Sequence, residues 1–157
     1  FDKDNQLIGA QGRALQESKV RYVTVKVYED APKVFGLERW NSDQHTYLVE
    51  GPIDSLFLPN CLAMAGADMS DLSILDKDKT TLIFDNEPRN REIVQRMERC
   101  LDKGFKVCIF PKKEIVKDIN DMVLDGTKPA DIEMIIDMNT YSGLSGKLQM
   151  AEWKKVT

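Results

Sequence analysis

The chain has 157 residues, 42% of them hydrophobic, which is enough for one compact domain with a real core. Its single histidine and its three cysteines lack the spacing of a zinc site or a disulfide framework, so we expect a reducing, cytoplasmic environment. No run is long enough for a membrane span and no signal-peptide layout is present, which predicts a soluble protein without membrane contact. Because the chain starts at Phe1, within an alternating segment, we expect it to be a piece of a longer protein.

The net charge is −4, but the charged residues are unevenly distributed. Residues 89–113 contain eight Lys and Arg and three acidic residues, whereas the segments before and after them are acidic. Two interpretations are open. The charges could belong to a solvated helix face and ordinary surface acids, or they could form an acidic metal-binding cluster beside a phosphate-binding surface.

The first 45 residues predict a small β-rich sub-region. Residues 6–11 and 20–27 alternate or are rich in β-branched side chains, which favours short strands. Residues 31–40 are predicted to form a loop that leads into a brief helical turn. This sub-region does not have the features of a stand-alone domain.

From Thr46 the pattern changes to short apolar runs that alternate with helical segments. We predict strands at residues 46–50, 62–66, 80–85 and 105–111, and a helix over residues 87–104. Pro52 is predicted to open a short helix after the first strand. Near-continuous apolar strands of this kind are typical of a parallel sheet that is covered on both faces. Residues 46–125 are therefore predicted to form an α/β core, with a mainly parallel four-stranded sheet flanked by helices.

The last part of the chain, residues 126–157, is predicted to be a helical or irregular extension. Two short helices are expected at residues 117–126 and 129–138, and the second carries apolar residues at helical spacing. Residues 139–157 are too rich in Gly and Ser to assign from the pattern.

Acidic residues follow the ends of three predicted strands. Glu50 ends the first strand, Asp85 ends the third with Glu87 two residues later, and Asp118 follows the fourth. Asp54 lies about one helical turn beyond Glu50. Carboxyl ends of parallel strands meet at one edge of a sheet, so we expect these carboxylates to converge. Such a cluster needs a cation, and its hard oxygen ligands suit Mg²⁺ or Mn²⁺ in phosphoryl or nucleotidyl transfer, although acids after strands are also ordinary loop residues and helix N-caps.

Several motifs resemble those of a known family. Residues 49–56, VEGPIDSL, resemble the strand–Glu–Gly–x–x–Asp motif of the Toprim family, and residues 82–90, LIFDNEPRN, resemble its Asp–x–Asp motif with Glu87 in place of the second Asp. Toprim domains occur in primases, topoisomerases and nucleases, so this likeness implies a fold but not a reaction. Three further stretches resemble elements of bacterial-type primases, in the right order: NQLIGAQGRALQESKVRY, VFGLERW and KDIND. The whole is similar to the RNA-polymerase domain of helicase-associated DNA primases of the T-even bacteriophage type.

This resemblance implies an enzyme that synthesises short RNA primers on single-stranded DNA from ribonucleoside triphosphates. It implies a replicative helicase as a partner, the host-cell cytoplasm as the location if a phage encodes the chain, and zinc only in an upstream module. Glu50 would be a general base or metal-proximal carboxylate, and Asp85 and Glu87 would be catalytic and hold Mg²⁺ or Mn²⁺. Asp54 and Asp118 would be outer or additional ligands.

The resemblance also implies contacts to template or nucleotide phosphates. Arg13 and Arg21 occupy the family's GR and RY positions. The family's lysine before the next turn has no match, because Asp30 stands at that position, and this leaves Lys26 and Lys33 as candidates to replace it.

Further basic residues are candidates from the pattern alone. Arg89 and Arg91 are placed in the first turn of the helix predicted at residues 87–104, where a helix N-terminus favours anions, and Lys117 stands beside Asp118. These three residues could contact phosphate or simply solvate the surface. Arg96, further along the helix, is expected mainly to solvate it.

Two other functions stay open. One is a Toprim-type metal-dependent nuclease that uses the same acids, and the other is a non-catalytic module that binds metal or nucleic acid. The stretch before Glu50 favours synthesis, because nucleases of this type do not need it.

Overall fold

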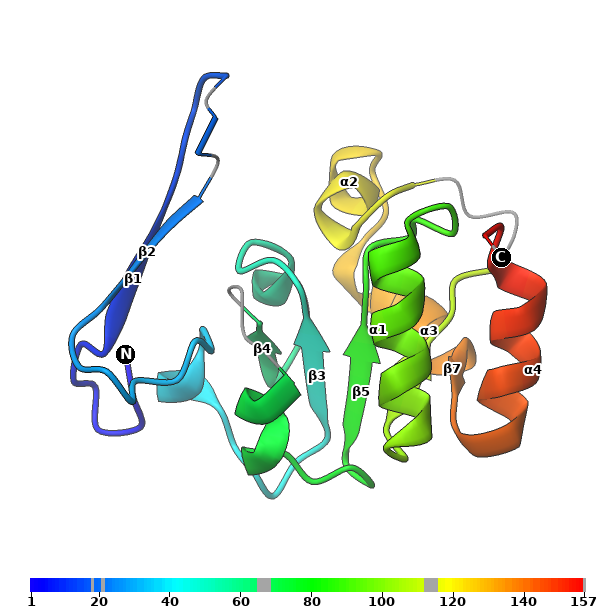
Figure 1. Cartoon of the computed structure of the whole chain (residues 1–157), viewed down its shortest axis with the longest axis horizontal. Helices are drawn as coiled ribbons and strands as arrows, with labels where there is room; N and C mark the ends of the chain where they lie inside the picture. The colour runs from blue at the N-terminus through cyan, green and yellow to red at the C-terminus, as the bar shows by residue number, and fades with distance from the viewer. Residues whose placement is uncertain (18, 21, 65–68, 112–115, 157) are drawn as a thin grey trace.

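Five strands form the central sheet of the computed structural model, which describes residues 1–17, 19–20, 22–64, 69–111 and 116–156 (Figure 1). The strand order is β4-β3-β5-β6-β7. Four strands are parallel: β3 (Thr46–Val49), β4 (Cys61–Ala63), β5 (Thr80–Ile83) and β6 (Lys106–Cys108). The predicted α/β fold with a mainly parallel sheet is confirmed, and a fifth, antiparallel strand, β7 (Thr140–Tyr141), is added to its edge.

The parallel strands are buried because helices cover both faces of the sheet. Every residue of β3, β4 and β5 is buried, as expected for strands that read as continuous apolar runs. Alternate side chains enter two separate cores. Leu48 and Leu82 face one core, and Tyr47 and Ile83 face the other.

In the part of the chain that the structure describes, two helices cover each face of the sheet. The core that contains Leu48 is closed by α1 (Arg91–Asp102) and α4 (Gly143–Trp153), and the opposite core by α2 (Ile119–Leu124) and α3 (Pro129–Met138). Figure 1 shows α1 and α3 on opposite sides of the sheet. The chain is therefore a three-layer α/β/α arrangement with the parallel strands in the middle layer.

Helix α1 begins later than the pattern predicts. The side chain of Asn90 accepts hydrogen bonds from the backbone N–H groups of Glu92 and Ile93, so the helix starts at Arg91 and not near residue 87. It ends before Gly104, whose φ of +87° suits a residue without a Cβ. The short helix predicted after Pro52 is a 3₁₀ turn, η2 (Asp54–Leu56), and two more 3₁₀ segments are η1 (Leu37–Arg39) and η3 (Met69–Ile74).

The C-terminal segment that the pattern left unassigned contains β7 and α4. Helix α4 packs closely on α1. A Cβ added at Gly146 would lie only 2.5 Å from Cδ2 of Leu101 in α1, so a larger residue would not fit at this position. Met150 and Trp153 bury the same face of α4 in the core. The glycine that obscures the helical pattern is thus needed for the close approach of two helices.

An antiparallel hairpin, β1 (Gly9–Arg13) and β2 (Tyr22–Lys26), forms the predicted β-rich N-terminal part. Its strands are almost entirely exposed, and Figure 1 shows it standing apart from the sheet on the β4 side. The segments next to it join the main core through Ile8, Val34 and Leu37, and Phe35 forms a bridge to Ala63 of β4.

None of the helices in the described ranges combines the length and apolar character needed to cross a membrane.

Candidate active site at the carboxyl edge of the sheet

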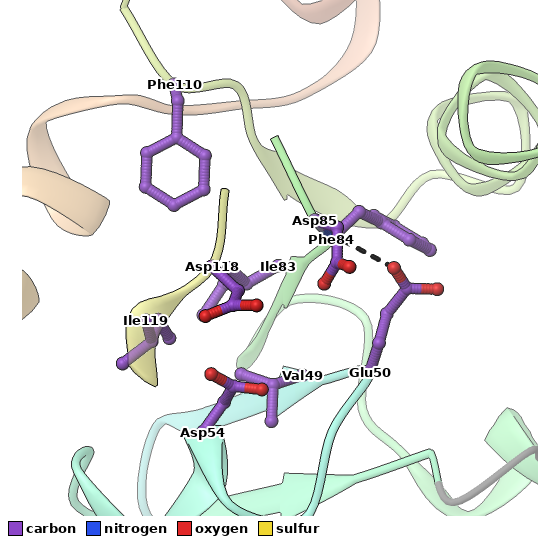
Figure 2. Close-up of a pocket in the computed structure, with 9 residues that line it drawn as sticks. All are labelled: Val49, Glu50, Asp54, Ile83, Phe84, Asp85, Phe110, Asp118 and Ile119. Carbon is purple, nitrogen blue, oxygen red and sulfur yellow. Dashed lines mark hydrogen bonds between the residues drawn. The ribbon is translucent and has the colours of Figure 1, made fainter. Parts of the chain in front are cut away.

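A small pocket lies at the carboxyl ends of β3 and β5, and the carboxylates of Glu50, Asp54, Asp85 and Asp118 line it (Figure 2). Apolar side chains complete its wall: Val49, Ile83, Phe84, Phe110 and Ile119. The structure therefore brings together four of the five acids that the sequence analysis selected. The fifth, Glu87, joins this group through a shared lysine.

Glu50 is held from two directions at the end of β3. One oxygen accepts a hydrogen bond of 2.6 Å from Nη1 of Arg96, and the other accepts the backbone N–H of Asp85 at 3.1 Å. Burial raises the pKa of Glu50, while the Asp85 N–H and the Arg96 charge act in the opposite direction. Both contacts fix the orientation of the carboxylate.

Arg96 is the residue that sequence reasoning missed. Its guanidinium lies over the ring of Phe84, with Cζ 5.5 Å from the ring centroid, and its Nη2 lies 3.6 Å from Sδ of Met64. The only local signal was its position three residues after Ile93, next to the buried face of α1. A basic residue so close to the apolar stripe of a helix is more confined than one on the solvent face.

Lys117 bridges Asp85 and Glu87. Its Nζ lies 3.1 Å from Oδ2 of Asp85 and 3.2 Å from Oε1 of Glu87. The hydrogen bond to Asp85 raises the pKa of Lys117, so the side chain is a full cation at neutral pH. Burial raises the pKa of Asp85 against the effect of Lys117, whereas a hydrogen bond from Asn90 is the main cause that lowers the pKa of Glu87.

Asp54 and Asp118 also serve the start of α2. Oδ1 of Asp54 accepts the N–H of Asn120 at 2.8 Å, and Asp118 is the N-cap of the helix and accepts the N–H of Asp121 at 2.8 Å. Burial raises the pKa of Asp54 to about 6, with the charges of Asp118 and Asp85 acting in the same direction. Within the described ranges, no Lys or Arg forms an ion pair with either residue.

The chemistry of the carboxylates around the pocket suits a divalent cation. In the part of the chain that the structure describes, no three Asp, Glu, His or Cys side chains are grouped closely enough to hold a metal ion. Mg²⁺, however, is commonly held by one or two carboxylates and completes its shell with water and substrate phosphates. The ammonium of Lys117 between Asp85 and Glu87 marks a place where these two carboxylates already stabilise a cation.

A series of hydrogen bonds fixes the backbone at Lys117. The N–H of Asn86 donates to the carbonyl of Lys117 at 2.7 Å, and its side-chain Nδ2 donates to the carbonyl of Val116 at 3.1 Å. Nε1 of Trp153 in turn donates to Oδ1 of Asn86 at 3.1 Å. Trp153 is 4% exposed and supports the site from inside the core.

The other basic candidates are not in the pocket. Arg13 is on the exposed hairpin with Cζ 5.7 Å from the ring centroid of Tyr22, and Lys26 donates to the carbonyl of Glu29. Lys33 is exposed in the loop before η1. None of these described residues lines the pocket, and Arg21 lies outside the described residues.

Arg89 and Arg91 are both exposed and both follow Glu87 closely in the chain. Arg91 is the first residue of α1, as predicted. Arg89 precedes the N-cap, so its placement in the first turn was wrong, because Asn90 delays the start of the helix.

Comparison with known proteins gives a consistent match. No protein-family model matches the chain. The chain is 36% identical over 150 residues to the DNA primase of Enterobacteria phage T4; this match covers 93% of the chain and 43% of the phage protein. The chain therefore spans less than half the length of that relative.

Three solved structures have a similar fold at low sequence identity. The Aquifex aeolicus primase, with its zinc-binding and RNA-polymerase domains, has a TM-score of 0.65 at 21% identity, with 89% of this chain and 39% of that chain covered. A DNA primase domain from Pseudomonas aeruginosa has a TM-score of 0.64 at 20% identity, covering 88% and 49% of the two chains. The catalytic domain of the DnaG primase bound to single-stranded DNA has a TM-score of 0.62 at 18% identity, covering 96% and 59%.

The similarity in sequence to a phage primase and the similarity in fold to primase domains point to the same family. The fold also places acids where the motif resemblance located them, at the carboxyl edge of a parallel sheet. The chain is similar in sequence to part of a phage DNA primase, and its fold is similar to that of primase catalytic domains.

Proposed function

We propose that this chain carries the nucleotidyl-transfer site of a primase, which synthesises short RNA primers from ribonucleoside triphosphates on a single-stranded DNA template. The observation that supports this most is the convergence of Glu50, Asp54, Asp85 and Asp118 on one pocket, with Glu87 linked to it by Lys117. Hard carboxylate oxygens at a sheet edge suit metal-dependent chemistry on phosphates.

Glu50 is suited to accept the proton of the attacking 3′-hydroxyl. Burial raises its pKa, and Arg96 and the Asp85 N–H hold the carboxylate in one orientation. The 3′-oxygen then forms a bond to the α-phosphorus of the incoming nucleotide, and pyrophosphate leaves. Asp85 and Glu87 would hold Mg²⁺ or Mn²⁺, with Asp54 and Asp118 as outer or additional ligands, and the bound cation would neutralise charge on the triphosphate.

The basic residues around the pocket are proposed to contact phosphates. Arg89, Arg91 and Lys117 lie close in the chain to the proposed ligands and would face the nucleotide. The exposed hairpin, with Arg13 and Lys26, would contact the template, and Lys33 and Arg21 are further candidates. One structural relative is described as bound to single-stranded DNA, which supports the same ligand for this chain.

The wider setting is also a proposal. A replicative helicase would be the partner of the complete protein, any zinc would belong to a separate upstream module, and the host-cell cytoplasm would be the place of action. These proposals rest on the family and not on side chains of the described residues.

The test is incorporation of labelled ribonucleotide on single-stranded DNA by the full-length protein, with Mg²⁺ or Mn²⁺. We expect Glu50→Gln and Asp85→Asn to lower the rate by about 10²-fold or more, the usual loss for a positioned acid or base. Glu98→Gln is the matched control, because Glu98 is a half-buried acid of α1 that pairs with Lys154 outside the pocket. DNA cleavage without synthesis would favour the nuclease, and binding without either activity would favour the non-catalytic module.

A further inference from the structure

The ammonium of Lys117 lies where the proposed function needs a metal ion. Its distances of 3.1 Å to Asp85 and 3.2 Å to Glu87 are those of direct ion pairs. Carboxylate oxygens that accept hydrogen bonds from an ammonium offer the same lone pairs that a divalent cation would take. The two cations therefore compete for the same pair of acids.

We propose that Lys117 is a built-in competitor of the metal, which neutralises Asp85 and Glu87 when no metal is bound and has to leave them for Mg²⁺ or Mn²⁺ to bind. This inference rests on the metal site of the proposed function and adds the residue that sets its affinity.

The lysine can leave without disturbing the loop that carries it. Its side chain is 49% exposed, so water can solvate the ammonium once it is released. Its backbone is held separately, since the N–H of Asn86 donates to the Lys117 carbonyl at 2.7 Å. Only side-chain rotations are needed, and these are fast compared with catalysis.

A divalent ion that replaces the lysine would meet further acids. Figure 2 shows the carboxylate of Asp85 facing those of Asp118 and Asp54 across the pocket. In the described ranges neither Asp54 nor Asp118 has a Lys or Arg ion-pair partner. The ion can therefore gain interactions that the single charge of Lys117, held on one side of the pocket, does not provide.

Once released, the ammonium of Lys117 would be able to bind the phosphates of a nucleotide. A nucleotide whose phosphates bind the metal brings phosphate oxygens next to the same acids, and Lys117 has three N–H donors to offer them. Metal and nucleotide would thus favour each other's binding, because the metal frees the lysine that the phosphate accepts.

The expected size of the competition follows from the exposure of the two ion pairs. Partly exposed pairs are weak, so Lys117 should occupy the acids in most but not all molecules, and the apparent metal dissociation constant rises by the inverse of the free fraction. Removal of the lysine should therefore tighten metal binding by about three- to tenfold.

The experiment is calorimetric titration of the full-length protein with Mn²⁺ alone, in the absence of nucleotide and DNA. We expect Lys117→Met to bind Mn²⁺ about three- to tenfold more tightly than the wild type, and Lys117→Arg, which keeps a competing cation, not to gain affinity. Lys117→Gln serves as a second neutral variant if the Met variant does not fold. Circular dichroism verifies the fold of each variant.

Two controls separate direct competition from simple removal of charge. Arg99→Met removes an exposed positive charge from α1, and among the described residues Arg99 forms no ion pair. Lys147→Met breaks an exposed ion pair with Asp102 elsewhere on the surface. Both should leave Mn²⁺ affinity within about twofold of the wild type, since exposed charges are well screened.

A double variant tests the shared partners. In a Glu87→Gln background Lys117 has lost one of its two carboxylates, so the gain from Lys117→Met should shrink. Equal or weaker Mn²⁺ binding by both neutral variants would overturn the proposal, and so would an equal gain in Arg99→Met. If Mn²⁺ bound to none of the proteins, the metal site of the proposed function would itself be wrong, which is a distinct result.

Discussion

Arg96 in the middle of α1 and Glu50 at the end of β3 form an ion pair of 2.6 Å across 46 positions of the chain. Both side chains are largely enclosed, with exposed fractions of 25% and 20%. Phe84 and Met64 also contact the guanidinium, so the arginine has little freedom to move away. Helix α1 thereby orients Glu50, the acid proposed as the general base.

Arg96→Gln should therefore lower kcat for primer synthesis while leaving the KM for nucleotide nearly unchanged. We expect a loss of about tenfold in kcat and of about 1–3 kcal/mol in the free energy of unfolding, because a partly buried carboxylate loses its charged partner. Steady-state kinetics and urea unfolding measure the two effects. Arg99→Gln, which removes an exposed arginine one turn further along α1, is the control and should change neither. A change in KM alone would assign Arg96 to nucleotide binding.

Divalent metal should stabilise the folded protein. A ligand that binds only the native state adds about 2.7 kcal/mol when its concentration is 100 times its Kd, so millimolar Mg²⁺ should raise Tm by several degrees. Asp85→Asn should abolish most of this shift. Asp102→Asn, an exposed acid of α1 paired with Lys147, should keep it. Differential scanning calorimetry with and without Mg²⁺ measures the Tm shift of each protein. A shift in Asp85→Asn equal to that of the wild type would argue against Asp85 as a ligand of the metal.

Asp54 should make metal-free stability depend on pH. Burial raises its pKa to about 6, above the ordinary value of 3.8, so its contribution to stability is complete below pH 4 and is lost as pH rises through about 6. Asp54→Asn avoids this loss and keeps an oxygen that can accept the Asn120 N–H. Urea unfolding in EDTA should find the variant more stable by about 1–2 kcal/mol at pH 7.5 and no more stable at pH 4. An equal gain at both pH values would show that the titration of Asp54 is not the cause.

Trp153 should affect activity through the loop that carries Lys117. Trp153→Phe removes the N–H that reaches Asn86, and Asn86 holds the carbonyls of Val116 and Lys117. Trp40→Phe is a matched control, since its indole also donates one hydrogen bond, to Oγ1 of Thr46 at the opposite end of β3. Both variants should lose about 1–2 kcal/mol of stability, but only Trp153→Phe should lower the rate of primer synthesis. An equal effect of both on the rate would rule out this specific role.

Local pattern was enough to predict most of the sheet and the place of the acids. The strands β3, β4, β5 and β6 are apolar runs bounded by turn residues, and α1 has its apolar residues at helical spacing. Once a parallel sheet is expected, Glu50 and Asp85 must lie at the same edge, because Glu50 directly follows β3 and Asp85 comes two residues after the end of β5. These inferences need only neighbours along the chain and one rule of topology.

What the sequence by itself determined was therefore the fold class, the order of the elements and the edge at which the acids gather. Only the tertiary structure decided that β7 and α4 complete the molecule, since Gly146 serves a contact with Leu101 that no local pattern records. Only it assigned Arg96 to Glu50, and Lys117 to both Asp85 and Glu87. Helix and strand preferences are set by residues a few positions apart, whereas charge pairs between distant segments depend on which strands become neighbours and how closely the helices pack on them.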